Sequence, residues 1–135
     1  MKRLLLVIFC GGLGSGARYL FGGWVAQLLG VAFPYGTIAI NAIGSFLIGL
    51  IMSLSLSTGA IGPDLRVALT TGVMGGFTTY STFNYETLAL FQQGAWRLGA
   101  LNVLVTVALC LAMGTLGLLA ARWLATQPWV AQVTP

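Results

Sequence analysis

Charged residues are too scarce in this chain to cover a water-facing surface. Six Lys and Arg residues, two acidic residues and no His occur among 135 residues, so 6% of the chain is charged while 58% is apolar. A soluble domain carries about 25% charged residues. We therefore predict one integral membrane domain over residues 1–135, an all-α protein whose solvent is the lipid bilayer.

The same scarcity excludes several functional classes. The basic residues are scattered singly, which argues against a nucleic-acid-binding face. The chain has no His, which excludes His-based metal sites and Ser-His-Asp triads. Asp64 and Glu86 are its only acids and lie far apart in the sequence, which argues against a paired-carboxylate hydrolase. We do not expect an enzyme. Cys10 and Cys110 form no CxxC motif and are interpreted as small buried hydrophobic residues.

Four apolar segments are long enough to cross a bilayer. Its hydrocarbon core is about 30 Å thick and needs about 20 apolar residues of helix. Residues 4–29, 37–57, 65–93 and 98–124 meet this requirement, and only short connections separate them. The sequence therefore predicts four transmembrane helices.

The third segment has an unusual centre, GVMGGFTTYSTFN at residues 72–84. Three glycines stand there among hydroxyl and amide side chains, and a glycine inside a helix costs about 1 kcal/mol relative to alanine. We predict that the helix is broken near residues 75–79; a polar packing helix is the alternative. Broken helices at the bilayer midplane free backbone carbonyls and amides for ion and substrate sites.

Small residues predict where helices pack closely. Gly12-x-x-x-Gly16 and Gly72-x-x-x-Gly76 are pairs of the kind that let helix backbones approach in lipid. Four helices of this size enclose little volume. A polar pathway would therefore use an oligomer interface, for which a two-fold dimer is the commonest arrangement.

The positive charges give a modest orientation bias. Lys2, Arg3, Arg66 and Arg122 are predicted on one side of the membrane and Arg97 on the other. Under the positive-inside rule, this imbalance is compatible with a single orientation that has cytoplasmic termini. It is also small enough for insertion in both orientations, so both alternatives stay open.

Polar residues inside the predicted spans are the functional candidates. Arg18, Asn41, Glu86 and Asn102 would each be expensive in lipid, and such residues are functional candidates by default. The alternative for Arg18 and Glu86 is snorkelling to the interface or hydrogen bonding between helices. Asn41 stands one turn inside an apolar helix, where its amide needs a partner.

Two further patterns suggest a pathway. Asn102, Thr106 and Cys110 are spaced i, i+4, i+8 and share one helix face. They form either a hydrated track or a seam of hydrogen bonds to a neighbouring helix. Tyr80 and Phe83 also share a face, and their positive ring edges could favour an anion, although plain packing is the alternative.

Three motifs, taken in order, resemble the Fluc (CrcB) family of fluoride channels. They are GSGARY at residues 14–19, GTIAINAIG at 36–44 and GVMGGFTTYSTFNYE at 72–86. The resemblance covers nearly the whole chain, and the third motif is the most specific. It implies a multi-pass protein of the bacterial inner membrane that exports fluoride ion passively and so lowers cytoplasmic fluoride. It further implies an antiparallel, dual-topology homodimer of two four-helix subunits with two parallel pores.

The resemblance also assigns residues. The carbonyls of Gly75 and Thr78 from both subunits would hold a structural sodium ion on the two-fold axis. Arg18 would draw anions toward the pore mouth, and Glu86 matches a family acid whose role stays open. The predicted pore-lining residues are Asn41, Thr79, Tyr80, Ser81, Thr82, Phe83, Asn102, Thr106 and Cys110. Tyr80 departs from the family, which usually has Phe there; its added hydroxyl needs a partner or water if buried.

Two other functions compete with this interpretation. A small proton-coupled exporter of the multidrug type would use Glu86 as its membrane carboxylate, yet that family carries its acid in the first span, where this chain has Arg18. A non-transporting assembly protein would explain the packing glycines but not the hydroxyl-rich centre of the third segment. No phosphate-binding motif is present to couple ATP, which favours a passive channel over a pump.

Overall fold

A computed structural model describes residues 1–128 and contains only helices and their connections over that range. Three long helices are α1 (Lys2–Leu29), α2 (Tyr35–Thr58) and α6 (Trp96–Ala125). By length and composition each can cross a membrane. The prediction of an all-α protein with several membrane-spanning segments is therefore confirmed.

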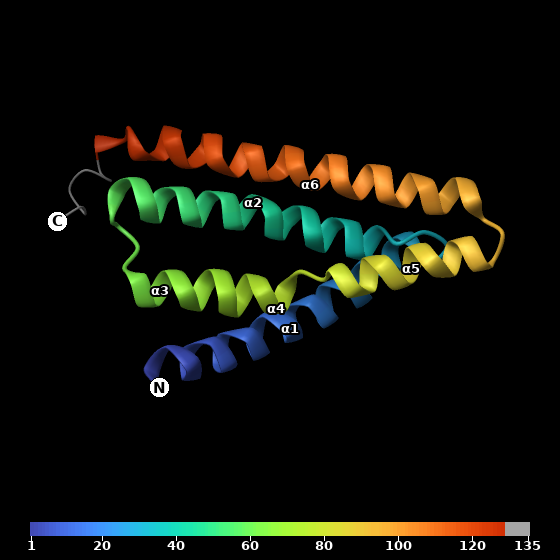
Figure 1. Ribbon diagram of the computed structural model, residues 1–135, viewed down its shortest axis with the longest axis horizontal. Helices are drawn as coiled ribbons and strands as arrows, with labels where there is room; N and C mark the ends of the chain where they lie inside the picture. Colours follow the sequence, from blue (N-terminus) through green and yellow to red (C-terminus); the bar gives the residue numbers. More distant parts are fainter. Residues whose placement is uncertain (129–135) are drawn as a thin grey trace.

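A fourth rod is assembled from shorter pieces. It runs through α3 (Pro63–Val67), the π-helical segment η1 (Ala68–Met74), α4 (Gly75–Phe77) and α5 (Tyr80–Gln92). Between α4 and α5 the backbone of Thr78 and Thr79 is extended, with ψ angles of 157° and 109°. Figure 1 shows this link as a thin yellow-green connection between two helical stretches of one rod. The interruption thus falls inside the interval 75–79.

The four rods run side by side and alternate in direction. Figure 1 shows the N-terminus, the start of α3 and the end of α6 at one end of the molecule, with the α5–α6 connection at the other. The rods begin at Lys2, Tyr35, Pro63 and Trp96, each two residues before the segment expected from hydropathy. Pro63 can occupy the first turn of α3 because the missing N–H would have no intrahelical partner there.

Helices α2 and α6 pack closely because glycines face the neighbouring backbone. A Cβ added to Gly117 would collide with the carbonyl oxygen of Phe46, and one added to Gly49 would lie 2.5 Å from the carbonyl oxygen of Gly114. A side chain at either glycine would push the helices apart. This is the small-residue packing by which helices associate in lipid.

The predicted pair Gly72 and Gly76 packs against α1. A Cβ on Gly76 would meet the carbonyl oxygen of Gly11, and a Cβ on Gly72 would lie 2.7 Å from the Cβ of Cys10. From the other side, a Cβ on Gly14 would meet the carbonyl oxygen of Val73. These contacts hold the broken rod against α1.

The prediction that Gly12 and Gly16 pack closely is wrong within the subunit. A Cβ added to either would meet nothing within 4 Å. The reason is helical phase: Gly14 lies two residues from each, which is about 200° around a helix with 3.6 residues per turn. Because Gly14 faces the broken rod, Gly12 and Gly16 point away from it.

The exterior of the bundle is apolar, as a lipid-facing surface must be. Large hydrophobic side chains such as Leu104 and Phe9 are each 68% exposed, whereas the fully buried side chain of largest volume is that of Asn102. A buried apolar cluster of Ile40, Met74 and Phe77 lies immediately before the interruption. Buried polar side chains, among them Thr79 beside the break, lie inside the bundle.

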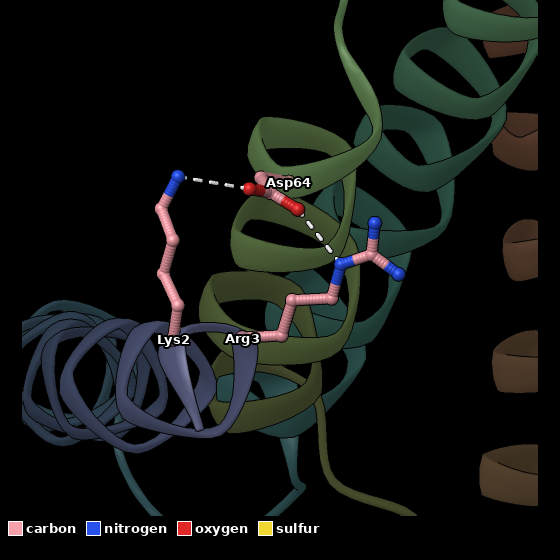
Figure 2. A network of polar contacts seen from close by, with 3 residues as sticks. All are labelled: Lys2, Arg3 and Asp64. Atoms are coloured by element: carbon pink, nitrogen blue, oxygen red, sulfur yellow. Dashed lines mark hydrogen bonds and ion pairs between the residues drawn. The ribbon is translucent and has the colours of Figure 1, made fainter.

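One end of the bundle is fastened by an ion-pair cluster. Figure 2 shows Lys2 and Arg3, from the start of α1, on either side of the Asp64 carboxylate at the start of α3. The Lys2 Nζ–Asp64 Oδ2 distance is 3.0 Å and the Arg3 Nε–Asp64 Oδ1 distance is 2.7 Å. The hydrogen bonds from Arg3 and then from Lys2 lower the pKa of Asp64 below its ordinary value of 3.8. The cluster connects segments that are 61 residues apart.

Candidate functional site at the helix break

The interruption is held open by one amide side chain from α2. Asn41 Nδ2 donates to the carbonyl oxygen of Thr79 at 3.0 Å, and the Thr79 N–H donates to Asn41 Oδ1 at 2.8 Å. A peptide group left unpaired in a membrane costs several kcal/mol, so both bonds replace partners that a continuous helix would have supplied. One of the two Asn41 amide hydrogens is thereby engaged.

The side chain of Thr79 organises the start of α5. Its Oγ1 accepts from the backbone N–H of Thr82 at 3.2 Å, which caps the helix. The same hydroxyl donates to Thr82 Oγ1 at 2.9 Å and lies 3.3 Å from Ser81 Oγ. Three predicted pore residues thus form one hydroxyl cluster at a helix N-terminus, where the backbone carries partial positive charge.

Helix α1 brings a cation to the same place. Arg18 Nη1 donates to the carbonyl oxygen of Thr78 at 3.4 Å, and Ser15 Oγ donates to that of Gly76 at 3.4 Å. The predicted sodium ligand Thr78 therefore faces Arg18 within the subunit. Arg18 lies beside the interruption and lines the first cavity.

Two cavities, each of about 600 Å³, lie beside the break. The first is lined by α1, α2, α5 and the α1–α2 connection, and it includes the predicted residues Arg18, Thr79, Thr82 and Glu86. Glu86 Oε1 accepts from Thr37 Oγ1 at 2.9 Å, while its buried Oε2 has no hydrogen-bond partner within residues 1–128. Sequence reasoning missed Thr37, although it stands one turn before Asn41 on α2.

The second cavity gathers five further predicted pore residues, whereas Ser81 lines neither cavity. It is lined by Asn41, Tyr80, Phe83, Thr106 and Cys110 together with apolar side chains of α2 and α6. The Tyr80 and Phe83 ring centroids are 5.6 Å apart with the planes inclined at 53°. The two rings differ in exposure, because Phe83 is 8% exposed and Tyr80 is 78% exposed in the subunit. A polar amide, a hydroxyl, a thiol and two aromatic rings therefore border one space.

The predicted row on α6 is divided between two roles. Thr106 and Cys110 line the second cavity, but Asn102 is only 1% exposed and belongs to a seam between α6 and α5. Its Nδ2 donates to Thr87 Oγ1 at 2.8 Å, and its Oδ1 accepts from Thr106 Oγ1 at 3.3 Å. The structure thus places Asn102 behind the cavity wall. Sequence reasoning missed Thr87, whose only signal was a hydroxyl four residues after Phe83.

The expectation that both cysteines are buried hydrophobic residues is wrong. Cys10 and Cys110 are free and half-buried. Cys10 packs beside Gly72, where no side chain fills the space. Cys110 lines the second cavity.

Comparison with known proteins covers most of the chain, including both cavities and the helix break. The family described as "CrcB-like protein, Camphor Resistance (CrcB)" matches residues 5–118. A "Fluoride-specific ion channel FluC" of Anaeromyxobacter dehalogenans is 54% identical over 125 residues, which is 93% of this chain and 99% of that protein. Proteins of the same name from Geotalea daltonii and Sorangium cellulosum are 48% and 46% identical, over 92% and 90% of this chain and 100% and 96% of their own lengths.

Proposed function

Because this chain belongs to the CrcB family, whose members compared above are fluoride-specific ion channels, we propose that it is a fluoride channel. It lets F⁻ cross the membrane passively and so lowers the fluoride concentration of the cytoplasm. The resemblance found in the three sequence motifs is thereby confirmed at the level of the family. The rival interpretation, a proton-coupled exporter that uses Glu86, has no support among these relatives.

The observation that carries this proposal is the position of the Asn41–Thr79 pair between the two cavities. Asn41 lines the second cavity and Thr79 lines the first, and the two are hydrogen bonded to each other. A small ion that passed from one cavity to the other would move along this pair. Polar groups therefore stand where the two cavities meet, while large hydrophobic side chains are exposed on the outer surface of the bundle.

The groups along the path suit a small, strongly hydrated anion. Fluoride must exchange its water for donors, and Asn41 has a second amide hydrogen for this purpose. The hydroxyls of Thr79, Ser81 and Thr82 stand at a helix N-terminus that favours negative charge. Arg18 adds a full positive charge beside the break, and the rings of Tyr80 and Phe83, which carry positive edges, line the second cavity.

The proposal extends to an antiparallel homodimer with two pores. Tyr80 and Gly75 are exposed in the single subunit, and Gly12 and Gly16 face open space on α1. The exposure of Tyr80 and Gly75 leaves room for a second copy beside the break, and Gly12 and Gly16 offer a second small-residue surface that points away from it. Close backbone approach across small residues would stabilise such a contact in lipid.

The proposed structural sodium ion fits the backbone at the break. In a continuous helix the Thr79 N–H would bond to the Gly75 carbonyl, but it donates to Asn41 Oδ1 instead. The Gly75 carbonyl therefore lacks its usual helical partner, and the extended backbone takes the Thr78 carbonyl out of the helix. Neutral carbonyl oxygens are ligands of the kind that hard cations take, so Gly75 and Thr78 of two subunits could hold such an ion at the two-fold axis.

A flux measurement tests the function. The purified protein is reconstituted in liposomes loaded with potassium fluoride, valinomycin is added, and release is followed with a fluoride electrode. We expect rapid fluoride release and negligible release in the matched potassium chloride experiment. A folded protein that released neither ion, or both at similar rates, would contradict a fluoride-selective channel.

A further inference from the structure

A buried chain of hydrogen bonds connects the wall of the second cavity to the backbone of α5. Thr106 Oγ1 donates to Asn102 Oδ1 at 3.3 Å, Asn102 Nδ2 donates to Thr87 Oγ1 at 2.8 Å, and Thr87 Oγ1 donates to the carbonyl oxygen of Phe83 at 2.7 Å. All four residues are less than 9% exposed. Water therefore has little access to these residues and cannot easily replace a hydrogen-bond partner in the series.

The donor and acceptor of every hydrogen bond in this series are fixed by the bond at the Phe83 end. A backbone carbonyl only accepts, so Thr87 must donate its single hydroxyl hydrogen to Phe83. Thr87 can then only accept from Asn102, which turns the Asn102 NH₂ group toward Thr87. The Asn102 oxygen is consequently left facing Thr106, whose hydroxyl must donate to it.

This order decides what Thr106 offers to the second cavity. A threonine hydroxyl has one hydrogen and two lone pairs, and the hydrogen of Thr106 points into the protein toward Asn102. The side of the hydroxyl that borders the cavity therefore carries lone pairs alone. Such an oxygen accepts a hydrogen bond from water, but it repels an anion.

We propose that Asn102 is a positioning residue that makes Thr106 an acceptor in the proposed pore. Thr106 then holds a water molecule and opposes direct contact with fluoride at its position in the second cavity. This inference rests on the proposed fluoride conduction, and it gives the Thr106 hydroxyl a role other than donation to the anion. Asn102 acts without touching the ion, because its side chain is sealed behind the cavity wall.

The test is a double-mutant cycle in reconstituted liposomes, with fluoride flux as the readout. Thr106→Val should raise the flux by roughly two- to tenfold, the effect of one modest hydrogen-bond energy on a barrier. Asn102→Leu removes the inward acceptor and leaves the Thr106 hydroxyl free to donate to fluoride. In that background Thr106→Val should lower the flux by a similar factor, so the effect of the same substitution changes sign.

Control variants distinguish an effect at Thr106 from a general effect of replacing Thr by Val and from loss of folding. Thr115→Val is matched to Thr106→Val because Thr115 lies on the same helix, is exposed and donates to its own helix at Leu111; it should leave the flux unchanged. Asn102→Ala replaces Asn102→Leu if the latter does not yield a folded dimer. A fall in flux or no change on Thr106→Val in the otherwise native chain overturns the inference, as does the same sign in both backgrounds. Absence of fluoride flux from the native chain would instead contradict the proposed function.

Discussion

Asn41 satisfies both backbone groups of Thr79, although the two residues are 38 positions apart in the chain. The side chain takes the place of helical neighbours at the point where the third rod is interrupted. Its loss should leave a buried N–H and a buried C=O without partners, each at a cost of about 1–3 kcal/mol.

Asn41→Leu is therefore expected to lower both the thermal stability of the purified protein and its fluoride flux. Liposome flux and a melting curve measure the two effects on one preparation. Ser57→Ala is the matched control, since Ser57 is an exposed residue of α2 that bonds only within its own helix. Native stability and flux in Asn41→Leu would mean that the break is held by other contacts.

Phe83→Ile should greatly reduce fluoride flux while the protein keeps its oligomeric state. The substitution preserves much of the apolar volume but removes the aromatic ring, with its positive edge, from the lining of the second cavity. Flux and size-exclusion chromatography measure the two properties. Phe9→Ile serves as the control, because Phe9 is 68% exposed on the outer face of α1. A full rate in Phe83→Ile would contradict the ring-edge role.

Tyr80→Phe should conduct fluoride at least as well as the native chain. It keeps the ring 5.6 Å from Phe83 and removes only the hydroxyl in which this sequence departs from the family. The initial rate of fluoride release measures the effect. A large loss would show that the Tyr80 hydroxyl has a positive role in conduction.

Gly117→Ala should destabilise the bundle, because the new methyl group would collide with the carbonyl oxygen of Phe46 on α2. Overpacking of this kind costs about 1–3 kcal/mol. Gly114→Ala on the same helix is the control, since its Cβ would make an ordinary contact at 3.7 Å with the carbonyl oxygen of Ser45. Equal melting temperatures for the two variants would contradict the close approach of α2 and α6.

The ion pairs of Asp64 should add stability in neutral solution that is lost in acid. Arg3 first and Lys2 second hold the pKa of Asp64 below its ordinary value of 3.8. The contribution is therefore complete above about pH 4 and disappears as the pH falls through the lower pKa of the folded state. Melting curves of the native chain and Asp64→Asn should differ at pH 7 and converge in acid. A difference independent of pH would show that charge is not responsible.

The sequence predicted the elements better than the contacts between them. The runs of apolar residues marked the four rods, and the glycines and hydroxyls of residues 72–84 marked the interruption. Neither pattern says which residues leave the helix. That is decided at Thr78 and Thr79 by Asn41, which belongs to another helix.

In the candidate site too, the sequence did not predict the contacts between helices. The spacing of Asn102, Thr106 and Cys110 placed them correctly on one face of α6, but not at one depth. Asn102 lies behind the wall because Thr87 on α5 meets it there, and a pattern within one helix contains no information about the neighbouring helix. For the same reason Gly14, rather than Gly12 and Gly16, faces the broken rod.

The fastening of Lys2 and Arg3 by Asp64 has a consequence for biosynthesis. Asp64 is translated 61 residues after Arg3, so α1 and α2 leave the ribosome while both cations at the N-terminus are still without this partner. Any pull that these charges exert on the insertion machinery acts in that interval. In the finished protein Asp64 pairs with both cations, whereas the nascent chain presents them unpaired while α1 and α2 emerge.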